Sequence, residues 1–534
     1  MLSAAALVSG RSLAWAGAGN GTLIPATNGS TPSYWCTWYA QVQMAESAPA
    51  GYGEASGHTR IARVLTEDAV FGPSGWAKQH FPAVRADLYL GFDLGWDVRA
   101  DENFDHANWL LGSHIVASDK FPSCMGSPYE RLRKLNQMTK AAGWRGAGLW
   151  VPAQVYGDGK DGKRLEDVAM RRYLLERLEW SRSAGIEYWK VDYGARGGDV
   201  EFRLLMTRLA HEVCPTLVVE HAINIGPLND ESAPWDTTPA THSGRFGDWE
   251  NGARLRSAVE VAKFSRAFRT YDVTEQLAGT TTLDRVGQEL LKLSNAGESA
   301  ATLNCEDEVY IAAALGLAMG VMRYPGPAIA DEESWLRRID EVTRAVRWQR
   351  MAPAFGAGTT SNRLSEAVLT DVWPVKAGET WATYLNGTVV KQGAPSIIAR
   401  NMPLPKVKTD GDPPFLVCAR HPRTETTAIY ALPRRSVAKG KFVPKADVEA
   451  LVNYPARPIG IFGRYGALKL IAERDWGKTV LAQDLAGEKV TDITSQVKLA
   501  GRQLIIPGQV IDTVGTSAGT KGDGSAPGLV LSVR

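Results

Sequence analysis

The chain contains 534 residues, of which 44% are hydrophobic and 22% are charged, and its formal net charge is +2. This length exceeds one comfortable hydrophobic core, so we expect a globular protein with two or more domains. The small net charge and the lack of a clustered basic stretch argue against nucleic acid as a partner.

Residues 1–32 form a lead-in before the first expected element. Within it, residues 2–18 are small and apolar and resemble a trimmed secretion signal, although the usual basic opening is missing. We therefore expect a secreted or periplasmic protein, and the alternative is an N-terminus with no targeting role. No apolar run is long enough to span a bilayer. The five cysteines are scattered without metal-ligand spacing, so we expect neither a disulfide framework nor a metal or other cofactor.

The first half of the chain alternates strand and helix signals. The clearest helix begins with the capping box Ser127-Pro-Tyr-Glu130, which has proline at the first helical position, and it ends at Gly143. A second helix ends in the same way at Gly185. The elements expected in this half are strands at 33–39, 88–93, 146–151, 188–192 and 217–220, and helices at 127–143, 167–184 and 199–213.

Residues 222–260 interrupt the rhythm with Pro, Asp, Gly and Trp, and we interpret them as a long loop over the site. The alternation then resumes and completes eight strand–helix units, which predict a (β/α)8 TIM barrel over residues 33–362. The rival is an open doubly wound sheet, which would require a glycine-rich first turn that the sequence lacks. The later elements are expected as strands at 268–273, 301–303 and 321–324, and helices at 283–293, 307–319 and 332–350.

From residue 363 to the C-terminus the pattern changes to short β runs separated by proline and glycine, which predicts an antiparallel β-sandwich domain. Residues 512–527 are rich in Gly, Ser and Thr and are interpreted as a flexible loop. The strands are expected at 381–385, 397–399, 415–418, 427–432, 459–462, 468–472, 504–506 and 529–533.

Lys190 and Asp192 come at the end of the expected strand 188–192, and alternation places them on one face of it. The carboxyl ends of barrel strands carry the chemistry of this fold. An aspartate beside a lysine stays ionised, which suits a nucleophile better than a proton donor. The alternative interpretation is an ordinary ion pair at a strand end.

Other strand ends add acids, cations and indoles, a set that suits a neutral polyol, because carboxylates accept hydroxyl hydrogen bonds and indoles cover sugar rings. Asp192 and Asp272 fall on different strands, as the two carboxyls of a glycoside hydrolase would. A separation of about 5–5.5 Å would mean retention and a wider one inversion. The expected binding residues are Trp38, Asp93, Trp96, Trp150, Lys190, Glu220 and Arg269; for the tryptophans the alternative is core packing, and for Glu220 an ion pair.

Several of these segments resemble glycoside hydrolase family 27, the α-galactosidase-like enzymes of clan D. Tyr188-Trp-Lys-Val-Asp192 resembles the Tyr-Leu-Lys-Tyr-Asp of that family, and residues 88–96 resemble its second-strand segment ending Asp-Asp-Gly-Trp. Residues 268–273 resemble the stretch that carries the acid/base, and 315–320 the helix before strand eight. The resemblance implies a retaining exo-glycosidase, with Asp192 as nucleophile, Asp272 as acid/base, Lys190, Arg269, Glu220 and Asp93 as hydroxyl ligands, and Trp38 and Trp150 as walls.

Three departures from the family pattern affect what it implies. Leu94 stands where the family has a second aspartate that holds the axial hydroxyl of galactose, so the sugar is open. Arg269 precedes Asp272 by three residues instead of four. The excess length between the two acids falls in the loop 222–260, where Asp248 is a competing candidate for the acid.

Two other classes of function remain at this stage. One is a metal-dependent hydrolase on the same barrel that would use His211, His221 and His242, although the sequence has no HxH pattern. The other is a carbohydrate-binding barrel that has lost catalysis. For the glycoside hydrolase and for the carbohydrate-binding barrel alike, the expected partner is an oligosaccharide or glycoside. The sequence does not indicate an oligomeric state.

Overall fold

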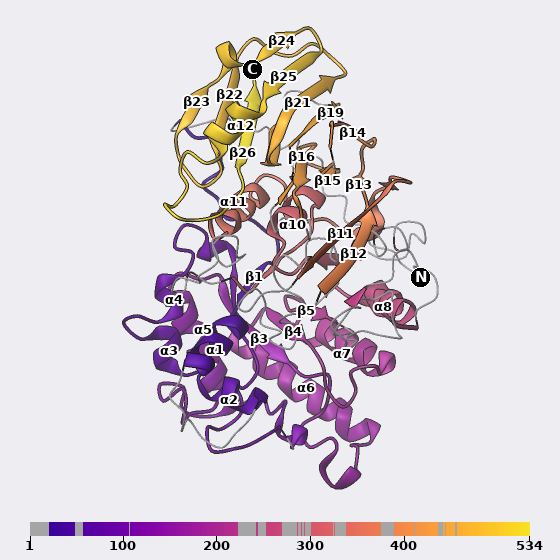
Figure 1. The fold of residues 1–534 in the computed structure, drawn as a ribbon. Helices are drawn as coiled ribbons and strands as arrows, with labels where there is room; N and C mark the ends of the chain where they lie inside the picture. Colours follow the sequence, from indigo (N-terminus) through magenta and orange to yellow (C-terminus); the bar gives the residue numbers. More distant parts are fainter. Residues whose placement is uncertain are drawn as a thin grey trace, which may run out of the picture.

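The computed structural model describes residues 21–47, 57–105, 107–222, 242–243, 253–269, 286, 290, 293, 301–323, 325, 338–374, 389–411, 413–435, 442–443, 445–453 and 457–534. A barrel occupies one end of the molecule and a region of β-sheets the other (Figure 1). None of the helices within the described residues is both long and apolar enough to cross a membrane.

The barrel is a single sheet of eight parallel strands in the order β8-β7-β5-β4-β3-β2-β1-β9. A further parallel bridge joins Asn304, at the end of β8, to Ala318, just before β9, so the sheet closes on itself. The expected TIM barrel is thereby confirmed. Its strands are β1 (Tyr34–Cys36), β2 (Tyr89–Phe92), β3 (Gly146–Val151), β4 (Tyr188–Val191), β5 (Val218–His221), β7 (Ala267–Arg269), β8 (Thr302–Asn304) and β9 (Gly320–Val321).

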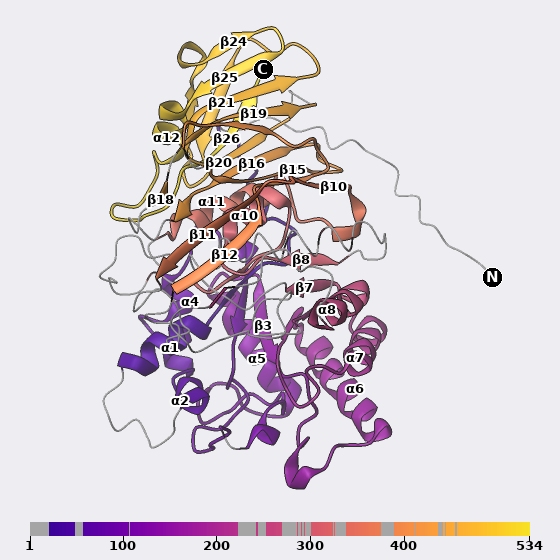
Figure 2. The ribbon, with the colours of Figure 1, turned by 45° about the vertical axis from the view of Figure 1, so that its right-hand side comes forward.

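Helices follow the strands and surround the barrel, with α5, α6, α7 and α8 side by side along one flank (Figures 1 and 2). The capping box at Ser127 is present, and Gly185 ends α6 in the left-handed conformation, as expected. The helices of this part are α1 (Trp38–Ser47), α2 (Gly57–Arg63), α3 (Glu67–Phe71), α4 (Trp76–Gln79), α5 (Pro128–Ala141), α6 (Asp167–Ala184), α7 (Val200–Val213), α8 (Ala253–Phe264), α10 (Val309–Leu315) and α11 (Asp340–Gln349).

Strand alternation divides the barrel into an apolar outer layer and a polar interior. On β4, Trp189 and Val191 join the large apolar cluster under the helices, whereas Tyr188 and Lys190 face inward. The barrel interior is crowded where β1 and β9 begin, because a Cβ on Gly320 would lie 2.5 Å from the Tyr34 hydroxyl oxygen. Glycine at this position therefore makes room for the Tyr34 ring.

The C-terminal region has an eight-stranded sheet, β10-β13-β15-β16-β20-β26-β22-β23, and a five-stranded sheet, β14-β19-β21-β25-β24. One apolar cluster, which includes Leu416, Ile429 and Leu470, joins the two sheets, consistent with the expected sandwich. Most ladders are antiparallel, but β13–β15, β16–β20 and β19–β21 are parallel.

The bounds of the elements in this region follow the chain order. The strands are β10 (Asn362–Leu364), β11 (Val368–Pro374), β12 (Val389–Pro395), β13 (Ile397–Arg400), β14 (Lys406–Lys408), β15 (Phe415–Arg420), β16 (Thr427–Leu432), β17 (Arg434–Arg435), β18 (Phe442–Val443), β19 (Ala446–Val452), β20 (Ile459–Gly463), β21 (Tyr465–Ala472), β22 (Val480–Asp484), β23 (Val490–Asp492), β24 (Lys498–Ala500), β25 (Gln503–Pro507) and β26 (Gly528–Val533). The hairpin β11–β12 also pairs with the barrel-loop strand β6 (His242–Ser243).

Helices α10 and α11 lie between the barrel and this region (Figure 2). Arg344 on α11 makes a bidentate ion pair with Asp484 on β22. Its Nε lies 2.8 Å from one carboxylate oxygen and its Nη2 lies 3.1 Å from the other. Both side chains are buried. The two parts are therefore held together by a paired charge as well as by apolar packing.

Three local expectations are wrong. The interval 222–260 is not a loop throughout, because helix α8 begins at Ala253. The run 33–39 is not one strand, because the Gln41 amide bonds to the Thr37 carbonyl and helix α1 begins at Trp38. Residues 512–515 belong to helix α12 (Gly508–Gly515), whose Ile511 and Val514 are buried against the sheets. The lead-in up to residue 20, most of the expected helix 283–293 and the expected strand 381–385 lie outside the described residues.

Candidate active site

Side chains from four barrel strands, β3, β4, β5 and β7, meet near the carboxyl end of β4. Parallel register places Lys190 of β4 opposite Trp150 of β3 and Glu220 of β5. Asp192 follows β4 directly, and Arg269 closes β7. The structure thus brings together most of the residues that were expected from separate segments of the chain.

Asp192 is held by two hydrogen bonds and one ion pair. The indole Nε1 of Trp150 lies 3.1 Å from Oδ2, the guanidinium Nη2 of Arg269 lies 3.3 Å from the same oxygen, and the Tyr193 amide donates to Oδ1 at 2.9 Å. Burial opposes ionisation, but the charges of Arg269 and Lys190 outweigh it and hold the pKa of Asp192 below its ordinary value. Its carboxylate is therefore an anion near neutral pH.

Arg269 bridges three carboxylates. Besides Asp192, its Nε lies 3.7 Å from Glu220 Oε1 and its Nη1 lies 3.5 Å from Glu306 Oε1. The Arg269, Glu220 and Glu306 side chains are all 0% exposed, whereas 12% of the Asp192 side chain is exposed. Within this group Asp192 is thus the carboxylate that a ligand can reach.

A second ion pair stands beside the first. Lys190 Nζ lies 2.9 Å from Asp93 Oδ2, and the Cys36 thiol lies 2.8 Å from the same oxygen. Burial disfavours the Lys190 ammonium, but Asp93 raises the pKa of Lys190 well above its usual value. Burial and Asp93 likewise raise the pKa of the Cys36 thiol, so it remains a neutral donor.

The Glu220 carboxylate lies deeper in the barrel than a side chain that binds substrate hydroxyls would. Tyr188 donates to Oε2 at 2.7 Å, Tyr34 donates to Oε1 at 3.1 Å, and the Asn304 amide also donates to Oε2. Burial and the neighbouring Glu220 raise the pKa of both phenols, which therefore stay protonated. The structure places Glu220 as a support of Arg269 inside the barrel rather than at its mouth.

The three tryptophans occupy different positions. Trp150 bonds to Asp192 and is 2% exposed, and Trp38 packs in the same apolar cluster with 8% exposure. Trp96 is fully buried and donates to the Trp150 carbonyl at 2.9 Å, so it supports Trp150 from behind and does not face Asp192. Leu94 is buried in the cluster of Trp38 and Trp150.

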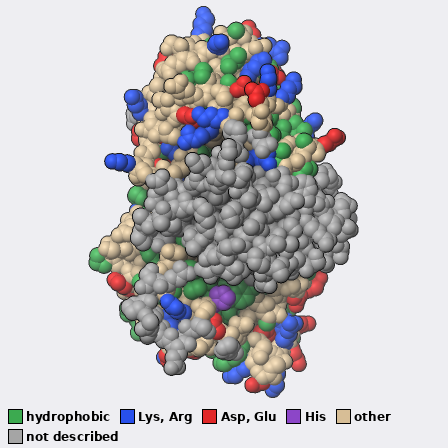
Figure 3. All heavy atoms as spheres, in the orientation of Figure 1, with side chains coloured by type: hydrophobic (Ala, Val, Ile, Leu, Met, Phe, Trp, Pro, Cys, Tyr) green, Lys and Arg blue, Asp and Glu red, His purple; other side chains and the backbone are tan. Residues whose placement is uncertain are grey.

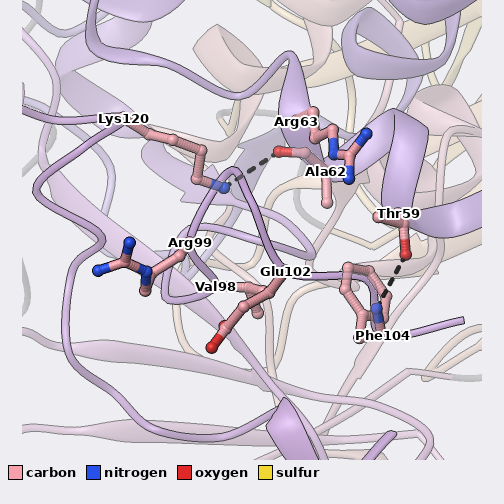
Figure 4. Close-up of a pocket in the computed structure, with 8 residues that line it drawn as sticks. All are labelled: Thr59, Ala62, Arg63, Val98, Arg99, Glu102, Phe104 and Lys120. Atoms are coloured by element: carbon pink, nitrogen blue, oxygen red, sulfur yellow. Dashed lines mark hydrogen bonds between the residues drawn. The ribbon is translucent and has the colours of Figure 1, made fainter. Parts of the chain in front are cut away.

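The loop after β2, which carries Asp93 and Leu94, is fastened from outside the barrel. Lys120 donates to the carbonyls of Ala62, at 3.1 Å, and Gly95. Gly95 has a φ of +99°, and a Cβ there would lie 2.3 Å from Ala62 Cβ, so only glycine allows this close approach. Figure 4 shows Lys120 beside the small hollow that lies behind this loop.

His221 does not belong to the site. Its Nδ1 lies 3.2 Å from Arg203 Nη1 and its Nε2 lies 2.8 Å from the Thr207 hydroxyl, both on α7. Burial and Arg203 lower the pKa of His221 well below its ordinary value, so it is neutral. Across the described ranges, no group of three or more His, Cys, Asp or Glu side chains is arranged to hold a metal ion.

Both candidates for the acid, Asp272 and Asp248, lie outside the described residues. The predicted set also omitted Tyr34, Cys36, Tyr188, Asn304 and Glu306, which complete the network. The signal for these residues was available in the alternation of β1, β4 and β8, since each is two positions from another inward-facing residue.

No family model matches the chain, and no curated protein matches it. Among solved structures, it is similar to a "putative alpha-galactosidase" from Bacteroides fragilis, with 10% identity, a TM-score of 0.39, and coverage of 94% of this chain and 79% of that one. It is also similar to a glucosidase from Croceicoccus marinus (9% identity, TM-score 0.34, 96% and 97% covered) and to a cyclomaltodextrinase (12%, 0.30, 68% and 76%). At these scores the likenesses carry no argument about activity.

Proposed function

We propose that this protein is a retaining exo-glycoside hydrolase, similar to the α-galactosidases of clan D, which removes a terminal glycosyl unit by double displacement. Asp192 would be the nucleophile and Asp272 the acid/base. The observation that carries this proposal is the position of Asp192: it is ionised, it is the reachable carboxylate of a buried charged cluster, and it stands at the carboxyl end of a barrel strand.

The charges around Asp192 suit the first step. Its ionised carboxylate attacks the anomeric carbon, the bond to the aglycone oxygen breaks, and the acid donates a proton to that oxygen. Arg269 and Trp150 hold Oδ2 in place, so the attacking group is oriented before the substrate arrives.

The described carboxylates near Asp192 do not suit the role of proton donor. Asp93 is paired with Lys190, and Glu220 and Glu306 are both paired with Arg269 inside the barrel. The proton donor is therefore expected in a neighbouring loop. Asp272 comes three residues after Arg269, which supports it over Asp248. In the second step the same group would take a proton from the water that releases the sugar.

The Asp93–Lys190 pair supports a polyol substrate. A carboxylate accepts hydroxyl hydrogen bonds and an ammonium donates them, so the pair can bind neighbouring hydroxyls of one sugar ring. Leu94, which is buried in the same apolar cluster as Trp38, presents no polar group for an axial hydroxyl. The glycone therefore need not be galactose.

The test is a panel of 4-nitrophenyl glycosides of both anomers, followed by trapping with the 2-deoxy-2-fluoro analogue of the best substrate. We expect a glycosyl adduct on the peptide that contains Asp192, and a loss on the order of 10³-fold or more in Asp192→Asn. The matched control is Asp167→Asn, an exposed aspartate on α6, which should keep full activity. Full turnover by Asp192→Asn would reject the proposal, and parallel loss in Asp272→Asn but not in Asp248→Asn would identify the acid.

A further inference from the structure

A file of aromatic rings leads from Asp192 to the surface. The Trp150 ring lies 5.5 Å from the Tyr193 ring, Tyr193 lies 6.4 Å from the His58 ring, and His58 lies 5.8 Å from the Trp38 ring, all measured between centroids. These residues come from different elements: Trp38 and His58 from α1 and α2, and Trp150 and Tyr193 from the ends of β3 and β4.

The file begins at the nucleophile. The Trp150 indole donates to Asp192, and Tyr193 is the next residue in the chain and gives its amide to the same carboxylate. Burial and the charges of Asp192 and Asp93 raise the pKa of Tyr193, so its phenol is a neutral group that faces the charged cluster.

Exposure increases from Trp150 to His58. Trp150 is 2% exposed, Tyr193 is partly exposed and His58 is exposed, whereas Trp38, on the other side of His58, is buried. The His58 ring is inclined by 35° to Trp38 and by 38° to Tyr193. His58 therefore presents an exposed ring between a buried and a partly buried ring.

Flat apolar surfaces beside hydroxyl-binding charges are what a saccharide or aryl ring needs, because its face is apolar and its edge is polar. The glycone ring would contact Asp192, Asp93 and Lys190. The next ring of the same ligand would then lie farther out along the file.

We propose that His58 and Tyr193 form an aglycone subsite, in which a neutral sugar or aryl ring stacks next to the bond that Asp192 attacks. This subsite deepens the proposed function and rests on it for the word aglycone, but the stacking itself requires no turnover. It distinguishes a ligand with a second ring from one that has only a methyl group.

The test measures binding by calorimetry to Asp192→Asn, which carries no nucleophile. The probes are 4-nitrophenyl and methyl glycosides of galactose, glucose and N-acetylgalactosamine in both anomers. We expect the aryl member of a binding pair to bind more tightly, and His58→Ala to weaken its affinity by roughly 2–12-fold, the range of one aromatic contact. The methyl glycoside should be unaffected, and His58→Phe should restore the aryl affinity.

The matched control is His211→Ala, an exposed histidine on α7 outside the site. Equal losses for aryl and methyl probes in His58→Ala, no change for either, or no binding of any probe would each overturn the subsite. If His58-dependent aryl binding is found in a protein that hydrolyses none of the glycosides, the subsite stands and the proposed hydrolase function fails.

Discussion

Replacement of Arg269 by glutamine tests whether one buried cation sets the charge state of the site. Its guanidinium lies 3.3, 3.7 and 3.5 Å from Asp192, Glu220 and Glu306. At an effective dielectric constant of 20, each contact is worth about 4.5–5 kcal/mol of gross attraction, most of which offsets the cost of burying the charges. Breaking such a buried arrangement typically costs about 3–5 kcal/mol.

The effect of this change depends on pH, with a defined sign. The folded pKa of Asp192 is depressed, so its ionisation stabilises the protein above the unfolded value of about 3.9 and ceases to do so as pH falls through the folded value. Without Arg269 the pKa of Asp192 loses the main charge that depresses it, so Asp192 takes up a proton on acidification and the repulsion among the three carboxylates is relieved. The loss of stability should therefore be largest near pH 7 and smaller near pH 4.5.

The assay is thermal unfolding of wild type and Arg269→Gln at both pH values, followed by circular dichroism. A loss of 3–5 kcal/mol corresponds to about 5–8 °C for a unit of roughly 300 residues. The control is Arg266→Gln, an exposed arginine directly before the same strand, which donates to the carbonyls of Pro215 and Leu217. A loss below about 1 kcal/mol at pH 7, or one that does not change with pH, would refute the reasoning.

Three further changes test the scaffold around the site. Lys190→Met should lower stability by about 3–5 kcal/mol and abolish glycoside turnover, because it leaves Asp93 buried without its cation; unfolding and turnover measured on one preparation check both. Gly320→Ala should cost about 1–3 kcal/mol, since its Cβ would meet the Tyr34 hydroxyl, and unchanged denaturant unfolding would contradict this. Ser127→Ala should cost about 0.5–2 kcal/mol without changing turnover, because it removes only a helix cap.

Local signals in the sequence determined the units of the barrel. The capping box at Ser127 and the glycine stop at Gly185 fix helix ends through contacts within a few residues, so they could be read directly and are confirmed. The same locality explains the failures. Residues 33–39 have strand propensity throughout, but the contact between Asp93 N and the Thr37 hydroxyl comes from another strand, and the chain turns into α1 there.

The candidate site was predicted in part for the same reason. Alternation along one strand places Lys190 and Asp192 on the inner face, and this required only the sequence. The depth at which a side chain lies depends on its neighbours from other strands. Glu220 was expected as a hydroxyl ligand, but Tyr34, Tyr188 and Asn304 occupy its oxygens inside the barrel.

The sequence by itself determined the order of the elements, their inward and outward faces, and the position of Asp192 at the end of β4. These features depend on residues close together in the chain. Only the tertiary structure decided which charges meet. Arg269 and Glu220 come from β7 and β5, and Glu306 follows β8. The pairing of these three neighbouring strands brings both glutamates within 4 Å of the Arg269 guanidinium, where burial makes each charge depend on the others. The charge state of Asp192 is therefore a property of the assembled sheet and not of its own segment.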